Sequence, residues 1–122
     1  MYSARFGNIC TAEQLLQLMK RASGEFTPRD DCWVGPKRTI VDPFRPTVQK
    51  GGFDSIDAMR KDREVHFECV NRMFKNLDVF VFTLGLTEAW RARTDKAVYP
   101  VCPGVAGGEY GSSLSNLQIT RL

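Results

Sequence analysis

The clearest candidate for chemistry in this sequence lies directly after an apolar run near residue 80. Gly85 permits a sharp turn, and Thr87 and Glu88 then supply a hydroxyl and a carboxylate. Residues 79–84 are apolar without alternation, which predicts a strand covered on both faces, as in the centre of a parallel sheet. Ligands of open α/β sheets bind at the carboxyl ends of strands, so this turn is well placed for a site. A second interpretation stays open, in which Thr87 only caps a following helix and Glu88 serves its first turn.

The single histidine is a second candidate. His66 follows Asp62 by four residues on a predicted helix. A histidine beside a carboxylate is a pattern for general acid–base catalysis. The same spacing also stabilises a helix with no catalytic role, and we favour that interpretation.

The cysteines point away from a metal site. Cys10, Cys32, Cys69 and Cys102 contain no C-x-x-C pair, and one histidine cannot complete a zinc site with them. We expect buried free thiols rather than disulfides. We also expect no metal and no cofactor.

Two helices are predicted to position these groups. The first covers residues 11–22, where Thr11 and Gln14 fit a capping box and Gly24 fits a helix stop. The second begins at Asp54 or Ser55 and reaches about residue 76. Its core-facing stripe is predicted from apolar residues at three- and four-residue steps: Ile56, Met59, Phe67, Val70, Met73, Phe74 and Leu77.

Several shorter segments are predicted to be extended. Residues 3–9 fit a short strand that leads into a Gly-Asn turn and the first helix. Residues 90–93 and 97–101 fit the two arms of a small hairpin. Residues 116–122 fit one more strand.

A long irregular loop is predicted over residues 25–52, because four prolines exclude any long helix there. Only residues 39–41 look extended within it. Trp33, Val34 and Phe44 are the expected anchors. Such a loop either wraps a site or simply covers the core, and both interpretations stay open.

Composition excludes several classes of protein. The 122 residues are 43% hydrophobic and 25% charged with a net charge of +3, an ordinary composition for a soluble domain. The basic residues are interspersed with acidic ones, so we expect no nucleic-acid partner. No apolar run approaches the ~20 residues of a membrane helix, and the first residues lack a secretion-signal pattern. We therefore expect no membrane span and a cytoplasmic protein.

Three blocks of the sequence resemble the GSCFA family. They are residues 3–9 with the helix that Thr11 begins, residues 41–46, and residues 78–90 followed by residues 99–104. The resemblance covers nearly the whole chain. GSCFA domains are similar to SGNH (GDSL-like) hydrolases. The resemblance therefore implies an α/β fold that is partly flavodoxin-like, a three-layer α/β/α arrangement with a parallel sheet that is incomplete in this chain.

The resemblance also implies roles for particular residues. In SGNH hydrolases a serine after the first strand is the nucleophile, and a late Asp-x-x-His completes the triad. A glycine after the second strand and the asparagine of a G-x-N-D block supply the oxyanion hole. Gly7 would be that glycine, while Thr87 would stand for the asparagine and Glu88 for the aspartate. Threonine offers a hydroxyl where asparagine offers an amide, so the oxyanion geometry would differ.

The family-naming Gly-Ser-Cys-Phe-Ala motif and an Asp-x-x-His motif are both missing from the sequence. The resemblance thus implies that residues 1–122 form one partial domain, the middle of a GSCFA domain, which is inactive alone. The parent would be a serine ester hydrolase or acyltransferase acting on a small-molecule, carbohydrate or lipid ester. The alternative is a non-catalytic binding or structural domain that keeps the fold. Because strand edges would lack neighbours, we expect self-association.

Overall fold

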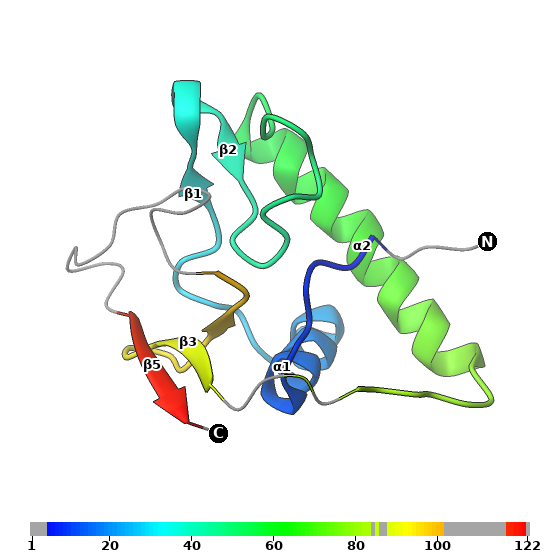
Figure 1. Cartoon of the computed structure of the whole chain (residues 1–122). Helices are drawn as coiled ribbons and strands as arrows, with labels where there is room; N and C mark the ends of the chain where they lie inside the picture. The colour runs from blue at the N-terminus through cyan, green and yellow to red at the C-terminus, as the bar shows by residue number, and fades with distance from the viewer. Residues whose placement is uncertain (1–4, 84, 86–87, 102–116, 122) are drawn as a thin grey trace.

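The computed structural model describes residues 5–83, 85, 88–101 and 117–121, and it has a mixed α/β architecture (Figure 1). Its two helices are α1 (Ala12–Ser23) and α2 (Ile56–Asn76), and a short 3₁₀ helix covers Pro36–Arg38. Two small sheets complete the described part of the chain. Within the described residues, neither α1 nor α2 is long and apolar enough to cross a membrane.

Helix α1 forms with the predicted caps. The Thr11 hydroxyl accepts the Gln14 backbone N–H at 3.1 Å, and the Gln14 side chain accepts the Thr11 N–H at 3.1 Å, so the capping box is confirmed. Gly24 ends the helix in the left-handed conformation, with φ of 83°. Leu18 is buried but Met19 is 42% exposed, so the buried face of α1 is narrow.

Helix α2 is capped by Ser55, whose hydroxyl accepts the Ala58 N–H at 3.1 Å. The predicted stripe is confirmed in its centre, because Met59 and Val70 are fully buried. Helix α1 lies between α2 and the larger sheet and contacts both (Figure 1). Val70 and Leu18 form the core between the two helices.

Both sheets are antiparallel. Strand β1 (Trp33–Val34) pairs with β2 (Ile40–Val41), and β3 (Glu88–Ala92) is central between β4 (Val98–Tyr99) and β5 (Leu117–Arg121). The predicted extended segment at residues 39–41, the hairpin and the final strand are therefore confirmed. Strand β1 was missed, since only residues 39–41 of the loop were predicted to be extended.

A second core joins the irregular loop to the hairpin of β3 and β4. The rings of Trp33 and Phe44 stack on Tyr99 with centroid distances of 5.3 and 4.7 Å. These two residues are buried and anchor the loop as predicted, whereas Val34 is 59% exposed and does not. The loop thus covers the core through two aromatic anchors.

The predicted parallel strand at residues 79–84 is wrong for the residues that the structure describes. Residues 77–83 are extended without forming a strand, with Val79 79% and Val81 84% exposed. A strand needs a neighbour for its backbone N–H and C=O groups, and no described segment lies in position to pair with this one. The flavodoxin-like parallel sheet is accordingly not formed among the described residues. A short strand was predicted over residues 3–9, and its described part, residues 5–9, is likewise unpaired and irregular.

Candidate functional site

Gly7 packs directly against the backbone of the long loop. A Cβ at this position would lie 2.4 Å from the Phe44 carbonyl oxygen and 3.0 Å from the Arg45 Cα. Real Cβ atoms do not approach backbone this closely, so only glycine fits without displacing the chain. The segment before α1 and the turn at residues 42–45 therefore form one packed unit.

Gly85 is joined to the same N-terminal segment. Its N–H donates to the Cys10 carbonyl oxygen at 3.3 Å. This hydrogen bond brings the chain just before Thr87 beside the chain that follows Gly7. Thr87 lies outside the described residues. Glu88 begins β3, where its backbone is in register with Arg121 of β5.

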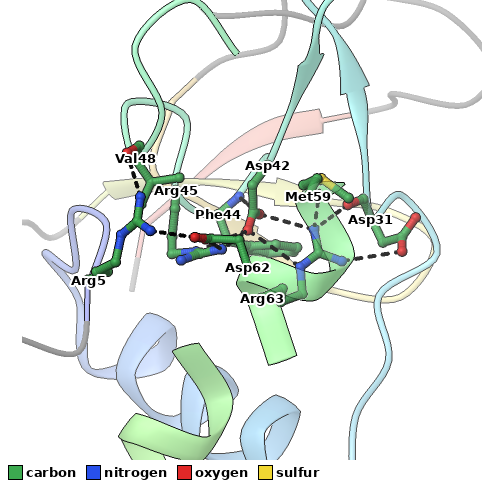
Figure 2. Close-up of polar contacts among 9 residues, drawn as sticks. All are labelled: Arg5, Asp31, Asp42, Phe44, Arg45, Val48, Met59, Asp62 and Arg63. Atoms are coloured by element: carbon green, nitrogen blue, oxygen red, sulfur yellow. Dashed lines mark hydrogen bonds and ion pairs between the residues drawn. The ribbon is translucent and has the colours of Figure 1, made fainter. Parts of the chain in front are cut away.

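An ion-pair network fixes the turn against which Gly7 packs (Figure 2). The Asp42 carboxylate is 1% exposed and accepts the Phe44 N–H at 3.0 Å and the Arg45 Nε–H at 3.0 Å. Arg63 of α2 lies 3.1 Å from the other face of Asp42 and also pairs with Asp31 at 3.2 Å. These contacts tie the loop to α2.

Arg45 extends this network toward the N-terminus. Its Nη2 lies 3.0 Å from Asp42 Oδ2 and 2.8 Å from Asp62 Oδ2, and its side chain is 2% exposed. Asp62 also pairs with Arg5, whose guanidinium donates to the Val48 carbonyl at 3.1 Å (Figure 2). The contacts of Asp62 therefore include two arginines from other segments, beyond any role within its own helix.

The charges set the protonation state of Asp42. Burial by itself would raise the pKa of this carboxyl, but the positive charges of Arg63 and Arg45 outweigh burial. The pKa of Asp42 consequently lies below its ordinary value, and the group is ionised at neutral pH.

His66 lies in the core. It is 3% exposed, and its ring meets the Phe6 ring edge-on at 5.7 Å between centroids. This position favours the structural interpretation of the histidine, because a base that serves a dissolved substrate needs an accessible nitrogen.

Two hollows meet at Gly7. One is a cavity of about 20 Å³ that Gly7 lines together with Arg21, Arg45 and His66. The other is an apolar hollow of about 270 Å³ lined by Phe6, Ile9, Leu15, Met73, Phe74, residues 80–82 and Gly7 itself. A small cavity of mixed lining and a larger apolar hollow thus flank the same glycine.

The cysteines and acidic groups offer no metal centre in the described part of the chain. Cys10, Cys32 and Cys69 are free thiols there, as predicted, but they are half-buried rather than buried, and Cys102 lies outside the described residues. Among the same residues, no three His, Cys, Asp or Glu side chains come close enough together to hold a metal ion.

Sequence reasoning missed the arginines. It singled out none of Arg5, Arg45 and Arg63 as a structural residue, although all three take part in the ion-pair network. A signal was present in Asp42 and Arg45, which share a short run with two prolines and an aromatic residue. Oppositely charged residues fixed in such a rigid turn favour a mutual ion pair.

The fold and the site define a small mixed α/β domain whose N-terminal glycine turn is packed against a buried arginine–aspartate network. The chain belongs to the GSCFA family, whose model matches residues 1–120. Searches of curated proteins and of solved structures gave no match. The family resemblance read from the sequence is thereby confirmed over essentially the whole chain.

Proposed function

We propose that this chain contributes the oxyanion side of a serine ester hydrolase or acyltransferase of the GSCFA family. Gly7 would donate its backbone N–H to the developing oxyanion, and Thr87 would add its hydroxyl, with Glu88 beside it. The observation that supports this proposal best is the hydrogen bond from Gly85 to Cys10. It holds the chain next to Thr87 against the segment that contains Gly7.

The reaction would proceed by attack of a serine on an ester carbonyl, formation of an acyl-enzyme and release by water or by an acceptor alcohol. Neither the family's serine motif nor its Asp-x-x-His motif occurs in residues 1–122. The proposal therefore assigns the nucleophile and the base to polypeptide outside these residues. The apolar hollow next to Gly7 would receive the acyl part of a small-molecule, carbohydrate or lipid ester.

The same proposal gives residues 79–83 a place in the complete domain. Their apolar sequence and high exposure are what a strand would show when its neighbours are not present. In the complete domain this segment would join a parallel sheet of the flavodoxin-like kind. Its end would then carry Gly85, Thr87 and Glu88 to the edge of the sheet.

The proposal is tested in two stages. Residues 1–122 alone should not hydrolyse short-chain nitrophenyl esters above the buffer rate. A polypeptide that adds the serine and Asp-x-x-His blocks should do so. In that active protein, Thr87→Val should lower kcat about 10²- to 10³-fold with little change in KM, as expected when one oxyanion donor is lost.

Two further variants make the test specific. Thr87→Asn restores the amide of the G-x-N-D block and should keep activity, while Thr94→Val, in the exposed turn of the hairpin, should leave kcat unchanged. Equal activity of Thr87→Val and Thr94→Val would refute the oxyanion role. Turnover by residues 1–122 that survives repurification would refute the view that the chain is inactive alone.

The alternative is a non-catalytic binding or structural domain. One observation favours it: the close approach of Gly7 to Phe44 already requires a glycine, without any oxyanion. A completed domain that folds cooperatively but turns over none of the ester classes would support this alternative.

A further inference from the structure

The small cavity beside Gly7 is lined by both apolar and polar side chains, and the proposed reaction does not use the polar ones. Its volume is about 20 Å³, which is enough for one occupant of roughly the size of a water molecule. The polar part of its lining comes from Asn8, Gln14, Gln17, Arg21, Arg45 and His66. The hydrogen-bonding groups of this lining decide what such an occupant must be.

The two glutamines are already engaged. The Gln14 side chain accepts the Cys10 and Thr11 N–H groups and donates to the Asn8 carbonyl at 3.3 Å. The Gln17 side chain donates to the Lys96 carbonyl at 2.8 Å and accepts the Val98 N–H at 2.7 Å. Both glutamine side chains are therefore held in place by hydrogen bonds to the backbone.

The two arginines each retain a buried donor. Arg45 Nη1 and Arg21 Nε are buried and have no hydrogen-bond partner among the described residues. The rest of Arg45 is held by Asp42 and Asp62, so its Nη1 cannot turn to another carboxylate. Buried charged donors of this kind are rarely left unsatisfied.

The buried charge of Arg21 also has no carboxylate paired with it in the described part of the chain. Its guanidinium lies 3.9 Å above the Phe44 ring. Burial lowers the pKa of Arg21 most, and the positive charges of Arg63 and Arg45 lower it further. The negative charge of Asp42 raises it in part, and the resulting pKa is about 10. Arg21 therefore stays charged at neutral pH without a counter-ion of its own.

We propose that this cavity binds one small monatomic anion, with chloride as the physiological example, between Arg21 Nε and Arg45 Nη1. An anion would accept both donors and would compensate the buried positive charge. A water molecule could accept the same two hydrogen bonds but would leave that charge uncompensated. A space of this volume suits a monatomic anion better than a sulfate or phosphate group. The inference concerns this chain alone and does not depend on the proposed hydrolase function.

Chloride-35 NMR tests the proposal directly on the 122-residue chain, because a halide that exchanges with a protein site gives a broadened line. The wild-type chain should broaden the line in proportion to protein concentration, and bromide should reverse the broadening by competition, whereas gluconate at equal ionic strength should not. Arg21→Gln removes a cavity donor without breaking an ion pair and should weaken the apparent affinity at least about tenfold, as expected for a charge-assisted contact.

Arg60→Gln is the matched control. Arg60 is 56% exposed, pairs with Asp31 and does not line the cavity, so its variant should match the wild type. Broadening that is the same in wild type and Arg21→Gln, or that gluconate reverses as well as bromide, would overturn the proposal.

Diffraction gives an independent readout that does not need a variant. A crystal of the wild-type chain soaked in bromide should show an anomalous peak within hydrogen-bond distance of Arg21 Nε and Arg45 Nη1. A water molecule at that position with no anomalous signal would overturn the proposal, whether or not Arg21→Gln folds.

Discussion

Replacing the carboxylate at the centre of the ion-pair network should destabilise the domain strongly. Asp42→Asn keeps the shape of the side chain and an acceptor for the Phe44 N–H, but it removes the negative charge between Arg45 and Arg63. Because Arg45 is 2% exposed, its guanidinium cannot turn to water when that charge is lost. The variant therefore isolates the electrostatic part of the network.

The magnitude follows from the contacts. A hydrogen bond to a charged group contributes about 1.5–3 kcal/mol, and Asp42 serves two arginines. In the variant, Arg45 still pairs with Asp62 and Arg63 still pairs with Asp31. The loss should therefore lie at the lower end of the range for two such hydrogen bonds, about 3–6 kcal/mol. We expect the free energy of unfolding to fall by about 3 kcal/mol at pH 7, within the range measured for broken buried pairs.

Urea unfolding followed by circular dichroism measures this difference, with Asp54→Asn as the control. Asp54 is exposed, so its variant should change the free energy of unfolding by less than about 0.5 kcal/mol. A loss in Asp42→Asn no larger than in Asp54→Asn would refute the reasoning.

The pH dependence supplies a second check. The pKa of Asp42 is lowered in the folded state, so its contribution is present above the unfolded pKa of about 3.9 and is lost as pH falls through the folded value. The gap in stability between wild type and Asp42→Asn should therefore be constant from pH 7 to about pH 5 and should narrow below about pH 4. A gap that widens in acid would contradict the assigned direction of the shift.

Three further outcomes follow from the packing. Gly7→Ala places a Cβ against a backbone carbonyl and should lower the free energy of unfolding by about 1–3 kcal/mol in urea titrations. Gly85→Ala, whose nearest contact is an ordinary 3.7 Å, should cost much less, and equal losses would show that the Gly7 contact is not tight. Thr11→Ala removes the N-cap of α1 and should lower the free energy of unfolding by about 1 kcal/mol, with a loss of helicity measurable by circular dichroism. Unchanged stability and helicity would contradict the capping role of Thr11. Size-exclusion chromatography should show self-association of the chain, and Val81→Lys should reduce it while Val65→Lys on α2 should not; a monomeric wild type would refute this expectation.

The helices could be predicted because their signals are local. Thr11 and Gln14 lie within one helical turn, and each side chain accepts the backbone N–H of the other. The two residue types and their spacing are therefore enough to predict this capping box. The spacing of Met59 and Val70 likewise specifies the buried face of α2 without reference to the rest of the chain. Such features survive whatever surrounds the helix.

The hairpin in the larger sheet could be predicted because its two strands are close in sequence. The hairpin of β3 and β4 needs one turn, and Trp90 and Tyr99 pair across it. Residues 79–84 carried the strongest apolar pattern, but pattern alone cannot provide the neighbouring strands on which a parallel sheet depends. Of the predicted site, Gly7 is explained by packing, while Thr87 and Glu88 keep their roles only as a proposal.

The arginine–aspartate network also bears on the order of events in folding. It links Arg5, Asp31 and Asp42 to residues of α2 that lie between 21 and 57 positions away in sequence. Contacts with such separations require large loops to close before any favourable energy is gained. We therefore expect the network to form after both helices and after α2 has docked on the loop. Interactions that form this late slow unfolding more than they speed folding.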